Sequence, residues 1–358
     1  MKMFSIENKL QFKQQFIKMY SKLKSKKFFL PFLTIIFVLI LFRQYFLQMI
    51  YFQSQVKQFD QNFHRELVED LYFNFNEIGF PFYVVPNIVH YILFDVKNIT
   101  FGHFVSLLSV MKNQKPDLIY IHCNCHQLSG DYYERALRVA YKTNTQLIVR
   151  TIERPTQIYG QKLSEKYLNW HSFDISRLQV LMEFGGIYLD RDVYVVQSLD
   201  VFRKYEMTLE WNQNQNLENS LMIANKNARF PRIWLDSYHD YDPNQYSFNA
   251  GELPTEMILK RQPHLVNRVM GKFGSSFRKT GVCPLLYSSY YENWMKDFYA
   301  FHLHIRDNEM SAERECFEGR HQNITTVFTE ENVKQLNVTF GQMSRIVFDF
   351  EKQIIDKK

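Results

Sequence analysis

The sequence predicts an α/β fold with a central, mostly parallel sheet, preceded by one transmembrane helix. Three observations predict it. Short β-rich runs alternate with segments of helical spacing from residue 84 onward, a glycine pair joins one helical segment to a short apolar run, and a long uncharged segment lies near the N-terminus. Alternation of strands and helices is typical of layered domains with parallel strands. The 358 residues suffice for one large domain or two small ones.

The N-terminal segment is basic and an apolar run follows it. Residues 1–27 hold eight lysines and one acid, so they carry a charge of +7, whereas the rest of the chain sums to −1. Residues 28–52 contain one charge, Arg43, and as a helix would extend about 37 Å, longer than a bilayer core of about 30 Å. We therefore expect a cytosolic tail (1–27), a transmembrane signal anchor (28–52) and a lumenal body. The basic charge belongs to the tail, which argues against nucleic acid as a partner.

A cleaved signal peptide and a buried core helix are the competing interpretations of the apolar run. The basic region before it is long for a signal peptide, and no small-residue cleavage site follows it. Four cysteines are present, and a disulfide between Cys283 and Cys316 is the preferred pairing. Three glycosylation sequons, at Asn98, Asn323 and Asn337, fit a lumenal domain, although each is common by chance.

The elements of the body follow from local pattern. Residues 53–83 are polar and aromatic and are interpreted as a stem, which leaves 84–358 as the folded domain. Runs rich in β-branched and aromatic residues predict strands, whereas apolar residues at helical spacing predict helices. The expected order is a strand at 84–94, a helix at 101–113, a strand at 117–122, a helix at 131–142, a strand at 145–152 and a helix at 172–186.

The stretch "SFDISRLQVLMEFGGIYLDRDV" carries the strongest chemical signal. Ser172 is a suitable helix N-cap, and the two glycines are a helix stop. The run "IYL" then begins a strand, and Asp190 follows where that strand would reach the surface. In open α/β sheets, ligands bind beyond the carboxyl ends of strands. In extended chain Asp190 and Asp192 face the same way, so a cation between them would relieve their repulsion, and oxygen ligands favour Mg²⁺ or Mn²⁺.

A pair of acids separated by one residue is weak evidence alone. With 37 acids in 358 residues, chance produces about four such pairs, and Asp240 and Asp242 form another. That second pair is followed by proline and no strand, which predicts a solvated turn. The preceding helix and glycine pair distinguish Asp190 and Asp192.

Residues 173–193 closely resemble the D-x-D region of glycosyltransferase family 32, which includes fungal α-mannosyltransferases and is similar to the glucosylating toxins. The shared pattern is S-D-I-x-R-x-x-x-L-x-x-x-G-G-I-Y-x-D-x-D, and the chain departs from it at Phe173. A weaker resemblance extends from about Pro86 to about residue 305. The family's tryptophan in the first strand corresponds to Leu93 here, which puts the base-stacking contact in doubt.

The resemblance implies a GT-A nucleotide-sugar-binding sandwich and a hexosyltransferase with a UDP- or GDP-sugar donor and Mn²⁺ or Mg²⁺. It implies that Asp192 ligates the metal and that Asp190 holds the ribose or donor sugar, partly through the metal shell. It also implies that Asp174 and Arg177 grip the donor sugar and diphosphate. The alternative is that both residues are purely structural. Asp174 would then be an acid in the first turn of the helix, and it would form an i,i+3 ion pair with Arg177.

A histidine near the C-terminal end often completes the metal shell in this family. His302, after "YAF", fits that position better than His304, although a structural histidine is the alternative. The "FNAGELPTEMI" segment is expected on the acceptor side, with Asn249 and Glu252 as polar candidates, and Asn219 is a further candidate. The run "HCNCH" at 122–126 is expected to be a strand-end loop near the donor, with zinc binding the alternative.

The complete prediction is a single-pass type II Golgi membrane glycosyltransferase with a lumenal catalytic domain. It transfers a sugar to a glycan, glycolipid or glycoprotein acceptor, with retention and an α linkage. Two other classes stay open: a metal-dependent sugar-nucleotide hydrolase or phosphotransferase, and a non-catalytic lectin-like or scaffold protein with the same fold. Hydrolysis of the donor without transfer would favour the first, and absence of metal binding the second.

Overall fold

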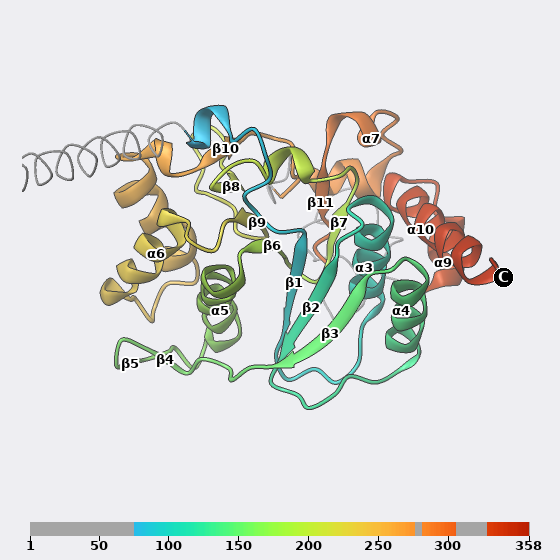
Figure 1. Cartoon of the computed structure of the whole chain (residues 1–358), viewed down its shortest axis with the longest axis horizontal. Helices are drawn as coiled ribbons and strands as arrows, with labels where there is room; N and C mark the ends of the chain where they lie inside the picture. Colours follow the sequence, from blue (N-terminus) through green and yellow to red (C-terminus); the bar gives the residue numbers. More distant parts are fainter. Residues whose placement is uncertain (1–74, 276–280, 306–327, 358) are drawn as a thin grey trace, which may run out of the picture. The chain divides into compact units, whose positions relative to one another are not determined.

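The computed structural model describes residues 75–275, 281–305 and 328–357 (Figure 1). The expected cytosolic tail (1–27), the membrane anchor (28–52) and the stem up to residue 74 lie outside the described residues. Within the described part, no helix is both long and apolar enough to cross a membrane. One compact unit spans Tyr72–Lys358.

A seven-stranded sheet forms the centre of this unit, in the order β10-β8-β9-β6-β1-β2-β3. Neighbouring strands run parallel except β9, which is antiparallel to both β6 and β8. The expected α/β fold with a mostly parallel sheet is therefore confirmed. The strands are β1 (Ile88–Leu93), β2 (Leu118–Cys123), β3 (Gln146–Thr151), β6 (Gly186–Leu189), β8 (Met207–Glu210), β9 (Leu221–Ala224) and β10 (Asn267–Val269).

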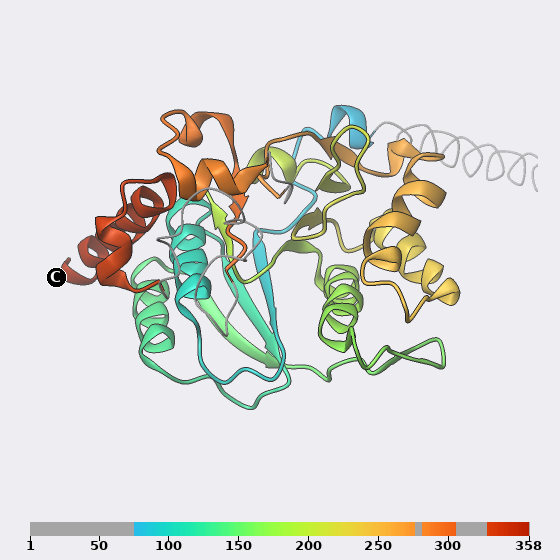
Figure 2. The ribbon, with the colours of Figure 1, turned by 180° about the vertical axis from the view of Figure 1, so that it is seen from behind.

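Helices cover both faces of this sheet (Figures 1 and 2). Helices α3 (Phe101–Asn113), α4 (Asp131–Lys142) and α10 (Thr339–Asp356) pack together on one face, and α5 (Leu168–Phe184) and α6 (Arg229–Asp236) pack on the other. The smaller elements are the hairpin β4 (Gln157–Ile158) and β5 (Gln161–Lys162), and α7 (Trp294–Asp297) and α9 (Glu330–Gln335). The expected helices at 101–113 and 131–142 have these bounds in the structure.

Side chains of the central strands alternate between the two faces and so build two hydrophobic cores. Along β6, Ile187 and Leu189 join the core under α3, whereas Tyr188 joins the core under α5. The same alternation holds in β1, where Leu93 lies in the α3 core and is 1% exposed. This burial removes Leu93 from any contact with a nucleotide base.

A second, two-stranded sheet pairs β7 (Val193–Val195) with β11 (Ala300–His302). Among the described residues β7 has a strand beside one edge, and polar side chains of α3 satisfy the other edge. Ser106 Oγ donates to the Val193 carbonyl (2.6 Å), and the Val195 amide donates to Ser109 Oγ (2.9 Å). Because these hydroxyls replace a neighbouring strand, serines are buried in an otherwise apolar helix.

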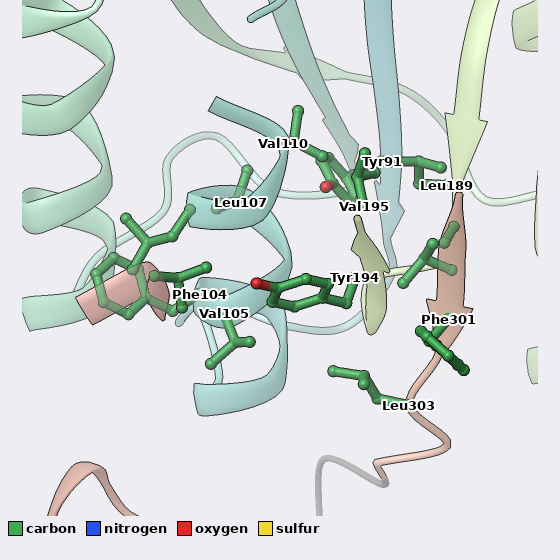
Figure 3. Packing of buried hydrophobic residues seen from close by; sticks show 14 of the residues in the cluster. Tyr91, Phe104, Val105, Leu107, Val110, Leu189, Tyr194, Val195, Phe301 and Leu303 are labelled. Atoms are coloured by element: carbon green, nitrogen blue, oxygen red, sulfur yellow. The ribbon is translucent and has the colours of Figure 1, made fainter. Parts of the chain in front are cut away.

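Large apolar side chains fix this small sheet against α3. Tyr194 points from β7 toward α3, while Phe301 and Leu303 lie on the other side of β7 (Figure 3). All three side chains are fully buried. The C-terminal strand β11 therefore has a fixed position beside the residues that follow the end of β6.

Three details of the expected elements differ in the structure. Helix α5 begins at Leu168 rather than at Ser172, whose hydroxyl lies inside the helix and donates to the Leu168 carbonyl one turn back. The helix ends at Phe184, and Gly186 already belongs to β6. Asn76, in the expected stem, is buried, and its side-chain oxygen accepts from the Met207 amide at 3.0 Å.

Candidate active site

A glycine turn sets the start of β6 and thereby the position of the acids that follow it. Gly185 has φ +65° and Gly186 has φ +114°, conformations that side chains rarely adopt. A Cβ at Gly186 would lie 2.6 Å from the Ile88 carbonyl oxygen and 2.8 Å from His90 Nε2. No other residue type fits this close approach between β6 and β1.

A buried histidine pair holds the same turn. His90 Nε2 donates to the Gly185 carbonyl (2.8 Å), so His90 Nδ1 accepts from His122 Nε2 (3.0 Å). Burial lowers the pKa of His90 to about 4 and that of His122 to about 3, so both rings are neutral at physiological pH. These neutral rings connect β1 and β2 to the glycine turn.

Replacement of Gly186 by alanine is expected to reduce the free energy of unfolding by on the order of 3 kcal/mol, because the new Cβ adds a clash to backbone strain. Gly160→Ala is the matched control. Gly160 also has a positive φ (+77°), but nothing lies within 4 Å of its Cβ position, so only about 1 kcal/mol of strain is expected. Urea denaturation of both variants measures the difference, and equal losses would contradict the close-approach argument.

Asp190 lies directly after β6, on the face of the sheet covered by α5. The Tyr188 hydroxyl donates to Asp190 Oδ1 at 2.6 Å, and the Asp190 amide donates to the Ser220 carbonyl at 2.8 Å. The guanidinium of Arg177 lies 3.5 Å from the same carboxylate. One oxygen of Asp190 is thus fixed by two neighbours, while the side chain keeps 25% exposure toward solvent.

Arg177 is the centre of a buried polar cluster. Its guanidinium lies 3.3 Å from Asp174 and donates to both the carbonyl (2.8 Å) and the side-chain oxygen (2.7 Å) of Asn219. Asn219 in turn donates to Asp174 at 3.0 Å. Burial raises the pKa of Asp174 to about 6, with Arg177 opposing the rise and Asp190 adding to it. The cluster joins α5, β6 and the start of β9 and places three of the expected site residues and Asn219 together.

Asp192 contacts a different part of the chain. Its carboxylate lies 3.1 Å from His302 Nε2 and accepts from the Ile305 amide at 2.7 Å. Burial acts to raise the pKa of Asp192, but the positive charge and hydrogen bond of His302 outweigh it and hold that pKa well below its usual range. Burial lowers the pKa of His302, whereas Asp192 and then Asp190 raise it, to a net value of about 9.

The sequence pattern suggested that Asp190 and Asp192 lie on one side of an extended strand. In the structure they do not. The Val193 amide donates to the Asp190 carbonyl (3.0 Å), so the chain turns between the two acids. Asp190 therefore meets Arg177 on the α5 side, and Asp192 meets His302 in β11. The turn still leaves both carboxylates at the carboxyl end of β6, where ligands bind in open α/β sheets.

Both candidate histidines lie near Asp192. Pairing of β11 with β7 places His302 opposite Val193, next to Asp192. His304 is buried and its ring lies beside that of His302, with centroids 4.0 Å apart. His302, the candidate that the sequence favoured, contacts Asp192 through Nε2.

The metal-free protein is expected to lose stability as pH rises, because His302 then loses the proton that stabilises its contact with Asp192. The raised pKa means that the stabilisation is complete below the ordinary value of 6.5 and disappears as pH passes through about 9. This difference corresponds to at most about 3 kcal/mol. Unfolding in EDTA between pH 6.5 and 9.5 measures it, with His302→Gln as the control. If the variant shows the same pH dependence as the wild type, other groups are responsible.

Glu218 was not among the residues expected from sequence. Burial first, and then Glu210 and Asp190, raise the pKa of Glu218 to about 7. It precedes Asn219 where the chain enters β9, and its amide donates to the Glu210 carbonyl at 2.9 Å. No spacing pattern marks it, because its position depends on the antiparallel pairing of β9 with β6.

Other candidates lie outside this cluster. Asn249 is buried and holds its own loop, since its side chain accepts from the Asp242 amide and donates to the Asp240 carbonyl. Glu252 is exposed. The expected solvated turn at the second acid pair is present, with Asp242 accepting from the Asn244 amide and the Gln245 side chain.

The "HCNCH" run ends strand β2 and continues into a loop, as expected, and its two cysteines are bonded to each other. Cys123 and Cys125 form a disulfide, so neither thiolate is available to zinc, and His122 pairs with His90. The zinc alternative is therefore wrong. Cys283 is disulfide-bonded, and its expected partner, Cys316, lies outside the described residues.

The comparisons with known proteins define the class. Residues 106–217 match the family described as a glycosyltransferase sugar-binding region containing a DXD motif. This match confirms the resemblance found from sequence, and it indicates an enzyme of the glycosyltransferase class. The match contains Asp174, Arg177, Asp190 and Asp192 and ends just before Glu218 and Asn219.

Particular relatives are more distant. The chain is 28% identical over 178 residues to glucan organizing enzyme 1 of Cryptococcus neoformans var. grubii, covering 44% of this chain and 45% of that protein. It is 27% identical over 135 residues to an uncharacterized protein of Arabidopsis thaliana, covering 36% of this chain and 21% of that one. The chain thus spans less than half the length of these two relatives.

Two solved structures that the chain resembles distantly are named as glycosyltransferases. The PaToxG glycosyltransferase is 19% identical, with 59% of this chain and 78% of that chain covered and a TM-score of 0.37. The galactosyltransferase LgtC, in complex with donor and acceptor sugar analogs, is 12% identical, with 72% and 95% covered and a TM-score of 0.37. Likenesses at this level do not define a donor or an acceptor for this chain.

Proposed function

We propose that this protein is a metal-dependent, retaining glycosyltransferase with a GT-A domain, which moves a sugar from a UDP- or GDP-sugar to a glycan, lipid or protein acceptor. One observation carries the proposal. The carboxyl end of β6, inside the family match, holds two acids, and each is fixed by a cation from a separate element. Arg177 of α5 contacts Asp190, and His302 of β11 contacts Asp192.

The Arg177 cluster suits the donor sugar and the leaving diphosphate. A buried guanidinium is always charged and donates in a fixed planar geometry. Two of its neighbours, Asp174 and Asn219, hold it in place, so it need not reorganise when charge develops on a departing phosphate. The carboxylate of Asp190 can accept hydrogen bonds from sugar hydroxyls on its exposed side.

The donor set at Asp192 fits a divalent cation. A carboxylate and an imidazole are ligands that Mn²⁺ accepts. Among the described residues, no group of three or more His, Cys, Asp or Glu side chains is arranged to hold a metal, so oxygens from the donor would complete the shell. Asp192 and His302 would hold the ion, after His302 loses its proton. Bound there, the ion would supply positive charge for the diphosphate.

We also propose that the protein is a single-pass type II membrane protein of the Golgi, with the body lumenal. The lysine-rich tail before the apolar run of 28–52 supports this orientation. Of the sequon asparagines in the described part, Asn98 and Asn337 are both exposed. Mn²⁺ and sugar nucleotides would then be required in the lumen.

Protease treatment of intact microsomes is expected to leave the body undigested until detergent is added, because the membrane would separate it from the protease. Glycosidase treatment should then shift its mobility, since exposed sequon asparagines carry N-glycans in the lumen. An antibody against the 328–357 segment can follow the body. Digestion without detergent would contradict the lumenal orientation.

Turnover of sugar nucleotides tests the enzymatic proposal. Purified protein is incubated with a panel of UDP- and GDP-sugars and Mn²⁺, with and without mixed oligosaccharide acceptors, and nucleoside diphosphate release is measured. Release that increases with acceptor and stops in EDTA supports transfer. Release that is indifferent to acceptor indicates a hydrolase, and the absence of release with every donor in the panel argues for a non-catalytic protein.

A further inference from the structure

Three aromatic side chains, two of them exposed and Tyr167 half-buried, form a cluster beside the start of α5. Trp170 is 47% exposed and Tyr246 is 52% exposed, and their ring centroids lie 5.3 Å apart in an edge-to-face arrangement. Tyr167 lies 5.9 Å from Tyr246 and 6.3 Å from Trp170. We call these three residues the aromatic platform. Contiguous exposed apolar side chains on a protein surface often mark interaction sites.

A buried histidine makes the platform rigid. His171 Nε2 donates to the Tyr246 carbonyl (3.2 Å), so His171 Nδ1 accepts from the Tyr241 hydroxyl (2.6 Å). That hydroxyl accepts from the Ser164 amide in turn (2.9 Å). Burial lowers the pKa of His171, which keeps this arrangement of donors and acceptors at neutral pH. The loop that carries Tyr246 is therefore tied to the beginning of α5.

The platform is continuous with the proposed donor site. Trp170, Asp174 and Arg177 lie at positions i, i+4 and i+7 of α5 and so share one face of the helix. A rise of about 6 Å separates Trp170 from Asp174 along the axis. The loop of Tyr246 also leads to this cluster, because the Ala250 carbonyl accepts from the side chain of Asn219 at 3.3 Å.

We infer that the aromatic platform is a glycan-binding subsite that takes one pyranose ring of the acceptor. A pyranose has a face of C–H groups that packs on a flat aromatic ring, while its hydroxyls at the rim stay hydrated or hydrogen-bonded. Rigid aromatic side chains provide such contact area at low conformational cost. The inference rests on the proposed function, because the platform adjoins the site where the donor sugar would lie.

The tryptophan content of the chain allows a direct binding measurement. The chain has four tryptophans, and the other three, Trp211, Trp234 and Trp294, are at most 6% exposed. A sugar on the platform therefore changes the fluorescence and acrylamide quenching of one indole. The probes are methyl α-D-mannopyranoside, methyl β-D-galactopyranoside, lactose and cellobiose, added to the full chain at millimolar concentrations.

We expect at least one probe to protect the exposed indole saturably, and Tyr246→Ala to weaken its apparent Kd by about tenfold. By isothermal calorimetry, Trp170→Ala should abolish the heat of binding, and Trp170→Phe should restore part of it because a ring face remains. Tyr141→Ala is the control, since Tyr141 is 82% exposed but belongs to α4 on the other face of the sheet. Weakening by Tyr141→Ala to the same degree would overturn the inference.

Kinetics separate this inference from the proposed function. For transfer to a probe that binds, Trp170→Ala should raise the acceptor KM about tenfold with little change in kcat. Binding to the platform without any transfer would contradict the proposed function and leave the subsite standing. The inference is overturned if no probe binds, if Trp170→Ala binds as wild type does, or if the platform proves to hold a second copy, shown by a dimer that Trp170→Ala dissociates.

Discussion

Asp192→Asn is expected to reduce turnover by roughly 10²-fold or more with little change in the fold. The substitution keeps the shape of the side chain and an oxygen that can accept from the Ile305 amide. It removes the negative charge that would hold a divalent cation and that now faces His302. The loss should therefore appear in metal binding as well as in rate, and Mn²⁺ titration followed by electron paramagnetic resonance measures it independently of activity.

Asp242→Asn is the matched control for this experiment. Asp242 belongs to the other acid pair, lies in a hydrogen-bonded turn, and has no contact with Asp192 or His302 among the described residues. Its replacement should leave both Mn²⁺ binding and turnover within about twofold. Comparable losses in the two variants, or full wild-type activity in EDTA, would rule out a metal at Asp192.

Arg177→Met is expected to reduce the free energy of unfolding by about 3–5 kcal/mol and to abolish measurable turnover. The side chain of Arg177 is 7% exposed and lies between the carboxylates of Asp174 and Asp190. Methionine fills most of the volume but leaves two acids and the Asn219 carbonyl without their donor. Chemical denaturation measures the stability, and nucleoside diphosphate release measures the activity.

Two further variants test the physical reason for that loss. Asp174→Asn in the Arg177→Met background removes one uncompensated carboxylate, so it should restore part of the stability but none of the activity. Arg150→Met removes a guanidinium from an ion pair with Glu183 whose side chains are 38% and 56% exposed, and it should cost at most about 1 kcal/mol. A similar cost for Arg150 and Arg177 would mean that the buried cluster has no special role.

Local pattern was sufficient to predict the elements whose ends are set by nearby residues. Helix α3 begins where Thr100 caps it, and its bounds could be read from spacing and sequence alone. Helix α5 was harder, because its N-cap residue, Tyr167, offers no side-chain cap and Ser172 resembles one. Trp170 lies between the true start of α5 and Ser172. Because the predicted boundary was wrong, the sequence did not place Trp170 on the helix or on the surface.

The site itself could be predicted only in part. The acids and Arg177 lie within one continuous motif, so their common location followed from the chain. The partners of Asp192 and the neighbours of Glu218 come from strands paired far along the sequence, and no local signal contains such pairings. The burial of Asn249 behind its own loop likewise depends on contacts with Asp240 and Asp242 rather than on its type.

The pairing of β7 with β11 has a consequence for biosynthesis. Residues 168–224 can bring Arg177, Asp190 and Asn219 together as soon as β6 and β9 have emerged from the ribosome. The partner of Asp192, by contrast, is His302 in β11, which is synthesised 110 residues later. During that interval a nascent chain would have half of its polar site assembled and an unpaired strand β7 beside α3. Chaperone contact is most needed in that interval, and a chain that ends before residue 300 would lack the His302 partner of Asp192.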